Sequence, residues 1–500
     1  MKKRFIPVLW GIGLILYLVF PGGGSGAMHG ELRPQRSASH SSDGGPGGEA
    51  PDGEGDVYLP LVLRSAATPA PPGVPRVNLS FFENQVRVVE TAVQWFGQVN
   101  GAENYADIRA GYNQSELYVH LAIFDRHAWY DTTPTTGTLT EWDAASLFLQ
   151  SGGQRPEALD ANSYQFTGQL NHYQPRPAYQ AAYRGSAGSW LLATLPFTTT
   201  VGMRGDQFNN NTVDDRGWMI TFQIPFASLG MSGPPPQGTV WSLAFRVYDR
   251  DDAAGTPIPE KAWPASAQTT SPTTWGEMRF GLPVYTPPPS TDPGTVTIRH
   301  RLNGAVVPDA AVGGGTNCGD GLDYWTAWGA ANYAYRQDFN VQDQMDVADW
   351  PCFSKYYVTF PLGALPAWKV IVSATFTLHE FGGSNPAQAQ RSLIQVLTVG
   401  EDWSEASLAW NNAPIPLENV SRAWVDPLPG FPGWPGVPFT WDVSLAVAQA
   451  YQQGTPLRLA LYSADGAYHS GKYFSTSDTG DWNQAARPTL TITYGTPRTP

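Results

Sequence analysis

Residues 402–414 read DWSEASLAWNNAP, and this stretch says more about the fold than any other part of the chain. Two tryptophans, Trp403 and Trp410, bracket the carboxylate of Glu405, and the run ends on Asn-Asn-Ala-Pro. Asparagine and proline favour turns, because the asparagine side chain hydrogen-bonds to nearby backbone and proline fixes φ. The stretch therefore predicts extended chain closed by a turn, with both tryptophans in the core and Glu405 as a hydrogen-bond acceptor that fixes the turn.

The composition of the whole chain agrees with an all-β fold. Only 15% of the 500 residues are charged, 13% are aromatic, and there are 52 glycines and 44 prolines. Such a composition favours many short strands joined by turns and disfavours long helices. A chain of this length is expected to form roughly two to four domains.

Further motifs surround the opening stretch in the C-terminal half. They are YYVTFPL at 356–362, ALP at 364–366, VSATFTL at 372–378, WDVS at 441–444 and RPTLTITY at 487–494. Together with residues 402–414 they resemble family 96 carbohydrate-binding modules, the secreted bacterial and archaeal domains also called DNRLRE. The resemblance implies a jelly-roll β-sandwich at residues 295–495.

Residues 77–284 show the alternation of a second β domain. ADIRAGY at 106–112 is followed by a turn, and residues 117–123 then place an apolar side chain at every second position, which predicts a hairpin with one buried face. The later motifs are EWDAASLFL at 141–149, WMITFQIPFASLG at 218–230, WSLAFRV at 241–247 and WGEMRF at 275–280. Their order resembles family 9 carbohydrate-binding modules, β-sandwiches related to DOMON-type domains. This chain has Ser146 and Gln150 where that family has acidic residues. The predicted fold is thus two antiparallel β-sandwiches in tandem.

Candidate carbohydrate-binding residues follow from the chemistry of sugars. The C–H face of a pyranose packs on an aromatic ring, while its hydroxyls take planar polar partners. The family 9 resemblance implies a pair of tryptophans that sandwich the sugar, Trp142 and Trp263, with Trp275 in place of Trp263 if that ring is turned inward. The candidate hydroxyl partners are Asn113, Arg246 and Asp249. The alternative for each tryptophan is a place in the core.

The C-terminal half offers a second candidate surface. Tyr324, Trp325, Trp328 and Tyr333 cluster in Gly-rich sequence with little alternation. Exposed aromatic side chains of this kind mark interaction sites. We therefore expect these four rings to line a carbohydrate-binding groove, with core packing as the alternative.

Two further sites concern covalent and metal bonds. Cys318 and Cys352 are the only cysteines, and in an oxidising compartment a disulfide between them is expected, with two buried free thiols as the alternative. Asp249, Asp251 and Asp252 are candidate ligands for a structural calcium ion, which prefers oxygen donors. Their alternative is an ordinary solvated turn, and no other cofactor is expected.

The N-terminus predicts export. Lys2, Lys3 and Arg4 precede an uncharged run from Phe5 to Phe20, which indicates a signal peptide at residues 1–27. We expect cleavage, which leaves no transmembrane segment, with retention as an anchor as the alternative. Residues 28–76 are predicted to be a disordered Gly/Pro/Ser-rich linker, and residues 285–294 a shorter Pro-rich linker. The expected location is extracellular or on the cell surface.

These features together predict the function. The net charge of −13 argues against nucleic acid and anionic membranes as partners. The sequence holds no Gly-x-Ser-x-Gly elbow, His-Glu-x-x-His motif, Cys-x-x-Cys motif or Walker loop. We expect a monomeric, secreted, non-catalytic protein that binds oligosaccharide, polysaccharide or cell-envelope polymers. Its expected role is carbohydrate catabolism beside separate glycoside hydrolases, or binding of the cell's own exopolysaccharide.

Two other functions fit the sequence. One is a structural or adhesive surface protein without sugar binding. The other is a glycoside hydrolase, which needs only two carboxylates at a fixed separation. Trp142 and Trp263 facing each other across a cleft would favour sugar binding, and buried rings would favour adhesion.

Overall fold

The computed structural model describes residues 71–498 apart from 172–174, 206, 344–349 and 467–468. The predicted signal peptide at 1–27 and most of the predicted linker, residues 28–70, lie outside the described residues. Everything described belongs to one compact unit, Arg64–Pro500. None of the helices in these residues is long and apolar enough to cross a membrane.

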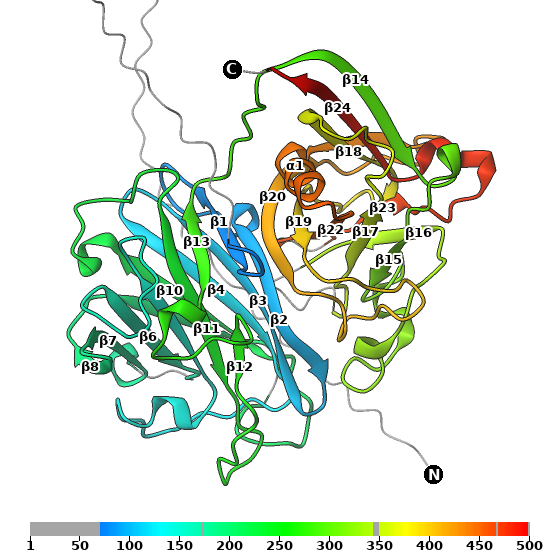
Figure 1. Ribbon diagram of the computed structural model, residues 1–500. Coiled ribbons are helices and arrows are strands. Elements are labelled where there is room, and N and C mark those ends of the chain that lie inside the picture. The colour runs from blue at the N-terminus through cyan, green and yellow to red at the C-terminus, as the bar shows by residue number, and fades with distance from the viewer. Residues whose placement is uncertain (1–70, 172–174, 206, 344–349, 467–468, 499–500) are drawn as a thin grey trace, which may run out of the picture. The chain divides into compact units, whose positions relative to one another are not determined.

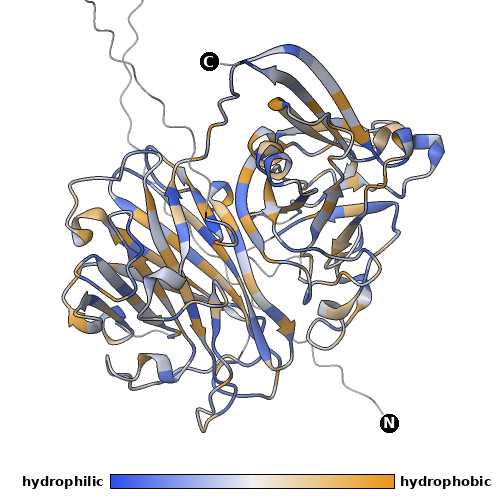
Figure 2. Ribbon diagram, in the orientation of Figure 1, coloured by the Kyte–Doolittle hydropathy of each residue, from blue (hydrophilic) through white to orange (hydrophobic). Residues whose placement is uncertain are grey.

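The all-β prediction is confirmed. The only α-helix among the described residues is α1 (Ser444–Gln453), and strands dominate the rest. The alternation that predicted strands is visible in β10 (Trp218–Pro225), where every second side chain is buried. Figure 2 shows the corresponding change between hydrophobic and hydrophilic residues along the strands.

The N-terminal sandwich consists of two sheets around one core (Figure 1). One sheet has the order β2 (Ala92–Asn100), β3 (Glu103–Tyr112), β4 (Glu116–Phe124), β10 and β9 (Thr198–Met203). The other has the order β1 (Arg76–Phe81), β13 (Gly276–Phe280), β11 (Val240–Tyr248), β5 (Ala144–Gln150), β6 (Ser163–Gln169), β7 (Gln180–Ser186) and β8 (Ser189–Ala193). A short strand, β12 (Lys261–Trp263), also pairs with β11. The predicted hairpin is β3 and β4, paired from Tyr105 to Tyr112.

The C-terminal sandwich is built in the same way. Its first sheet has the order β15 (Asp309–Val312), β17 (Lys355–Phe360), β22 (Leu457–Ser463), β19 (Ser392–Val399) and β20 (Pro416–Val425). Its second sheet has the order β14 (Ser290–Arg299), β24 (Thr489–Pro497), β18 (Val370–Gly383), β23 (Lys472–Ser475) and β16 (Asp338–Val341), and β21 (Val437–Asp442) pairs with β18. Strand β14 begins inside the segment predicted to be a linker, at Ser290.

The two sandwiches share backbone and side-chain contacts. Strand β1 pairs in parallel with β13 and also bridges to β20, where Arg76 is opposite Glu418. The amide of Asn78 donates from Nδ2 to Glu418 Oε1 at 2.9 Å and to the carbonyl of Asn419 at 2.8 Å, and Asn419 Nδ2 donates back to the carbonyl of Asn78 at 2.9 Å. All of these groups are buried, so they satisfy one another rather than water.

A third hydrophobic core lies between the sandwiches. It combines residues of β2, β3 and β4 with residues of the C-terminal half. Trp95, Tyr105 and Phe124 come from the first half, and Tyr357 and Trp410 are among their partners from the second. We call this cluster the shared core.

Two ionisable side chains, Lys355 and Asp107, are buried at the shared core. Lys355 Nζ lies 3.4 Å from the ring centroid of Trp410 and 4.3 Å from that of Trp95, and it donates to the hydroxyl of Tyr105. Asp107 accepts hydrogen bonds from the hydroxyls of Tyr105 and Tyr462. Burial lowers the pKa of Lys355 well below its usual value. Aromatic faces and nearby carboxylates therefore replace water around this amine.

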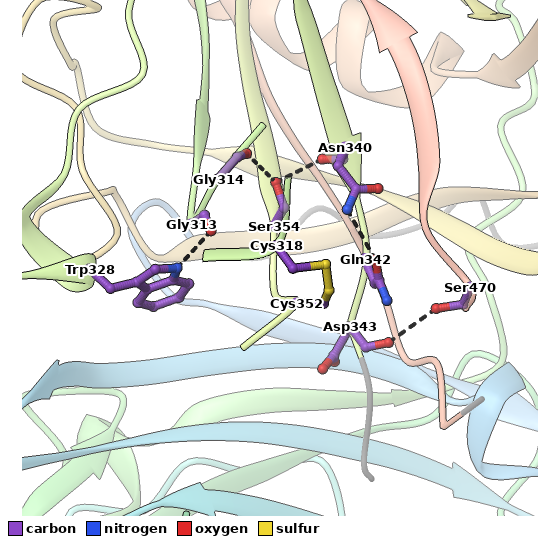
Figure 3. Close-up of a disulfide and its surroundings, with 10 residues drawn as sticks. All are labelled: Gly313, Gly314, Cys318, Trp328, Asn340, Gln342, Asp343, Cys352, Ser354 and Ser470. Atoms are coloured by element: carbon purple, nitrogen blue, oxygen red, sulfur yellow. Dashed lines mark hydrogen bonds between the residues drawn. A yellow bond between two sulfur atoms is a disulfide. The ribbon is translucent and has the colours of Figure 1, made fainter. Parts of the chain in front are cut away.

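The predicted disulfide is confirmed, since Cys318 and Cys352 are bonded (Figure 3). Hydrogen bonds fix the chain around it. The indole of Trp328 donates to the carbonyl of Gly313 at 2.7 Å, and the hydroxyl of Ser354 donates to the carbonyl of Gly314 at 3.0 Å. The disulfide thus closes loops that also contribute side chains to the shared core.

Candidate functional site

A pair of stacked tryptophans stands out in the N-terminal sandwich. Trp142 follows the short helix η2 (Leu139–Glu141) and is partly exposed, as is Trp129. The two ring centroids are 6.4 Å apart and the ring planes differ by 27°. Trp142 therefore pairs with Trp129 and not with Trp263 as predicted.

Hydrogen bonds hold Trp129 in place. Its backbone N–H donates to Asp143 Oδ2 at 2.7 Å, and its indole N–H donates to Asn211 Oδ1 at 2.8 Å. Asn211 in turn donates from Nδ2 to the carbonyl of Asp251 at 2.6 Å. Two loops distant in the sequence thus fix the orientation of one ring of the pair.

The spacing of the pair is close to what a sugar needs. A pyranose held between two rings makes a carbon–carbon contact on each face, so the rings must be about 7–8 Å apart. The two ring centroids are 6.4 Å apart, less than this distance, so the rings must move apart before a sugar can enter between them. Arg126 is three residues before Trp129 in the sequence, and its Nε donates to Asp214 Oδ1 at 2.8 Å with both side chains reaching solvent. Such groups can bond sugar hydroxyls.

A cluster of three carboxylates lies next to the backbone of Trp129. Asp125, Asp143 and Asp249 are buried, and each offers a carboxylate oxygen within 4.8 Å of the others. Asp143 accepts from the backbone N–H groups of Trp129 and Arg250, whereas Asp125 Oδ2 and Asp249 Oδ1 have no hydrogen-bond partner among the described residues. Two oxygens of a buried cluster are therefore available to a further ligand.

The electrostatics of the cluster favour a proton or a cation. Burial and the neighbouring Asp251 raise the pKa of Asp125 to about 7. Burial and the negative charge of Asp125 raise the pKa values of both Asp143 and Asp249 well above the usual range. Three like charges cannot coexist here at neutral pH without a counter-charge.

The predicted calcium ligands are only partly brought together. Asp249 belongs to the cluster, but its partners are Asp125 and Asp143 rather than Asp251 and Asp252. Asp252 Oδ1 accepts from the backbone N–H groups of Ala254 and Thr256, so this side chain closes a turn. Sequence reasoning grouped residues that are adjacent in the chain, whereas the fold groups residues from three strand ends.

Two predicted site tryptophans lie in the core. Trp263 is only 1% exposed and packs against Phe245, because β12 pairs with β11 and turns this ring inward. Trp275 is buried against Phe148, and its indole N–H donates to the carbonyl of Gln268 at 2.6 Å. Neither ring presents a face to solvent.

Two predicted hydroxyl partners have structural contacts. Asn113 is buried and its Oδ1 accepts from the backbone N–H groups of Ser115 and Glu116, which makes it the turn residue of the β3–β4 hairpin. Arg246 pairs with Glu260 at 2.6 Å and lines a pocket of about 480 Å³. Neither residue lies beside Trp142 in any contact of the described chain.

The predicted aromatic groove of the C-terminal half is not open. Tyr324, Trp325, Trp328 and Tyr333 are all buried. The first three belong to the shared core, and Tyr324 lies 6.2 Å from Phe124 of the N-terminal sandwich. Most of the partners of these rings come from distant loops of the same half, such as Trp350, Phe353 and Trp410, and Phe124 adds one contact from the other half.

Part of the C-terminal half matches a known protein family. Residues 326–494 match the model of carbohydrate-binding module family 96. This match supports a sugar-binding role for the C-terminal sandwich. None of the curated proteins is similar enough to the chain to count as a match.

Solved structures match the chain over about two fifths of its length. A family 9 carbohydrate-binding module from Caldicellulosiruptor kristjanssonii in complex with cellotriose is 16% identical, with 41% of this chain and 93% of that chain covered and a TM-score of 0.28. A family 9 carbohydrate-binding module from the same organism in complex with glucose is 15% identical, with 41% of this chain and 95% of that chain covered and a TM-score of 0.27. A putative carbohydrate-binding protein from Bacteroides uniformis is 12% identical, covers 42% and 100%, and has a TM-score of 0.31.

Sequence reasoning missed Trp129, Asp125 and Asp143 as site residues. A signal was present, because residues 124–130 read FDRHAWY and place an acid and a tryptophan directly after a buried strand. Strand ends with polar and aromatic side chains are common sites of binding loops.

Proposed function

We propose that this protein binds glycans outside the cell and does not cleave them, with the Trp129–Trp142 pair as its principal binding site. The ligand is an oligosaccharide or polysaccharide, taken up for catabolism beside separate glycoside hydrolases or belonging to the cell's own exopolysaccharide. The observation that carries the proposal is the pair of partly exposed, nearly parallel rings. Flat aromatic faces next to planar polar groups are what pyranose recognition requires.

The carboxylate cluster supports binding without hydrolysis. In glycosidases the two catalytic carboxyl groups are about 5 to 9.5 Å apart and face the substrate. The oxygens of Asp125, Asp143 and Asp249 lie within 4.8 Å of one another and are buried. A buried cluster of three carboxylates is suited to holding a cation next to the loop of Trp129. It is not suited to flanking a glycosidic bond, because its oxygens do not face a substrate.

We also propose that the cluster holds a calcium ion. Calcium takes six to eight oxygen ligands, chiefly carboxylates and carbonyls. The buried, unpartnered oxygens of Asp125 and Asp249 fit this chemistry. Since Asp143 also binds the backbone of Trp129, a cation here would stabilise the loop that carries the site.

The adhesive function remains the competing proposal. Buried Trp263 favours it, because the predicted pair of facing rings is absent. Trp129 replaces Trp263 as the partner of Trp142, so a pair of nearly parallel, partly exposed rings is still present.

Calorimetric titration of the full chain with a panel of oligosaccharides tests the proposal. In the Trp142→Ala variant the affinity is expected to fall about ten-fold or more, because an aromatic ring at the centre of a small site carries much of the binding energy. The matched control is Trp368→Ala, since Trp368 is 91% exposed and distant in the sequence from both rings. Equal affinity in both variants, or no heat with any glycan, would favour the adhesive function.

A further inference from the structure

A patch of aromatic side chains lies on the surface of the C-terminal sandwich. Trp434 is at its centre, with its ring centroid 5.1 Å from that of Phe431 and 5.1 Å from that of Trp482. Phe381 of β18 lies 5.6 Å from Trp434 on the remaining side. We call these four residues the Trp434 patch.

The patch is exposed. Phe431 is 61% exposed, Trp434 49% and Trp482 66%. Large aromatic side chains with half or more of their surface in water are rare singly and unusual as a contiguous group, and such groups mark binding surfaces. No described part of the chain covers them, so the patch has no role in the core.

The backbone holds the two tryptophans in place. Gly436 donates from its N–H to the carbonyl of Gly433 at 2.9 Å, which closes a tight turn around Trp434, and both glycines have positive φ. A side chain at Gly436 would come within 2.5 Å of the carbonyl of Glu380. A side chain at Gly480 would come within 2.7 Å of the Trp482 ring. The positions of both rings are therefore built into the fold, as expected of a preorganised site.

Rows of hydroxyl groups adjoin the patch along the outer face of the same sheet. In one row, Thr440 of β21, Thr377 of β18 and Thr489 of β24 are directly opposite one another, with Arg299 of β14 at the end. In the next row, Asp442, Thr375, Thr491 and Thr297 are opposite one another in the same way. All these side chains are partly or fully exposed.

The charges near the patch are largely balanced. Asp481, next to Trp482, pairs with Arg301 at 3.0 Å and with Arg487 at 2.6 Å. His379 lies two residues before Phe381 on β18, and burial lowers its pKa, so it is uncharged at neutral pH. A surface of rings and hydroxyls with balanced charge suits a neutral ligand rather than an acidic one.

We propose that the Trp434 patch and the adjoining threonine rows form a second carbohydrate-binding surface, which takes the chain of a neutral polysaccharide. The rings pack on the C–H faces of the sugars, and the threonine hydroxyls bond their hydroxyl groups. This inference rests on the proposed function of the protein, but it uses other residues and another sandwich than the Trp129–Trp142 pair.

The test uses the full chain with insoluble and soluble neutral polysaccharides, and with one acidic polysaccharide for comparison. Pull-down on insoluble cellulose is combined with affinity electrophoresis in gels that contain xylan, soluble starch or polygalacturonate. The starting protein is the Trp142→Ala variant, so that the first site is disabled. It is expected to retain binding to a neutral polysaccharide, and adding Trp434→Ala and Trp482→Ala is expected to lower that affinity about ten-fold or more.

Controls separate the possible results. Trp368→Ala, which removes a still more exposed tryptophan elsewhere on the same sandwich, is expected to change nothing, and circular dichroism checks that each variant folds. If Trp142→Ala abolishes all binding and the double change in the native background has no effect, the second surface is refuted and the proposed function stands. If the native protein binds none of the glycans, both proposals fail.

Two further outcomes would overturn the inference about the Trp434 patch and leave the proposed function unaffected. One is retention only by polygalacturonate that weakens steeply with added salt, since that behaviour indicates an electrostatic site for an acidic polymer. The other is a concentration-dependent dimer in sedimentation that Trp482→Ala dissociates while glycan binding is unchanged. The patch would then be a contact between two copies of the chain.

Discussion

At the scale of single residues, the carboxyl groups of Asp125, Asp143 and Asp249 link stability to the binding loop. They are buried together, and one of them holds the backbone of Trp129. Without a cation, the folded protein must keep protons that the unfolded chain releases. Any agent that neutralises the cluster therefore stabilises the fold and the site together.

The pH dependence of this cluster has a definite sign. The pKa of Asp125 is about 7 in the folded state and 3.8 in the unfolded chain. Between about pH 4 and pH 7 the folded state holds more protons, so its stability falls as the pH rises. With chelator present, we expect the melting temperature of the native protein to drop between pH 5 and pH 8, and that of Asp125→Asn to drop less.

Calcium is expected to reverse this loss. At neutral pH, an ion at one hundred times its Kd would stabilise the native protein by about 2.7 kcal/mol. Thermal unfolding with calcium or chelator, for the native protein and Asp125→Asn side by side, measures both effects. A calcium response of equal size in the two proteins would place the ion elsewhere.

Individual residues also show where sequence reasoning stops. Cys318 and Cys352 could be paired because no other cysteine exists, and Trp142 could be singled out because the family 9 resemblance implies a site tryptophan there. The partner of Trp142 could not be found, because ring stacking depends on how two loops fold over strand ends. The Trp434 patch had a local signal, Gly-Trp-Pro-Gly at 433–436, whose glycines indicate a tight turn with the ring at its tip.

At the scale of elements, β1 is the strand that joins the sandwiches. It pairs with β13 in the first sandwich and bridges to β20 of the second. The side chain of Asn78 on this strand bonds Glu418 and the backbone of Asn419. In the unfolded chain these groups bond to water, and in the folded protein, where water does not reach them, they bond to one another.

Replacing Asn78 is expected to weaken this junction. Asn78→Ala removes both amide donors and leaves Glu418 Oε1 and the Asn419 carbonyl with fewer partners in a buried place, a cost of about 2–4 kcal/mol. Urea denaturation measures it, with Asn162→Ala as an exposed asparagine control. A loss no larger than that of the control would show that water enters the junction.

Strands themselves were predictable where one face is buried. Alternation gave the inward residues of β10, because side chains on a strand alternate between faces. The prediction of one buried face was wrong for β3 and β4, since the shared core also buries their second face. Strand β14 was missed in part, since Ser-Thr-Asp-Pro-Gly at 290–294 has the composition of a linker. The segment nevertheless forms a strand, because its backbone pairs with β24 in an antiparallel sheet.

At the scale of the whole molecule, the shared core decides how the halves behave. Trp95, Tyr105 and Phe124 of one sandwich pack with Tyr357 and Trp410 of the other, around the buried amine of Lys355. The resemblance of each half to a separate module predicts two independent sandwiches, and it cannot show an interface that forms only in this tandem. The aromatic cluster at 324–333 was expected to be exposed because its partners, such as Trp350 and Trp410, are distant in the sequence.

We expect the two halves to unfold together. Separation would expose the rings of the shared core and leave Lys355 without the faces of Trp95 and Tyr105. Calorimetry of the full chain should therefore show one cooperative transition, and a fragment of residues 295–495 should melt at a lower temperature and bind a hydrophobic dye. Two transitions that coincide with those of the isolated fragments would contradict this expectation.

The junction at β1 also limits the choice of expression host. Asn78 and Asn419 each stand in an Asn-x-Ser sequence, the acceptor for N-linked glycans, and both side chains are buried against each other. A eukaryotic secretory pathway modifies such sequences before folding is complete. A glycan on either residue would keep the two strands apart, so a bacterial host, or a serine-to-alanine change at the acceptor sequence, is the route to correctly folded protein.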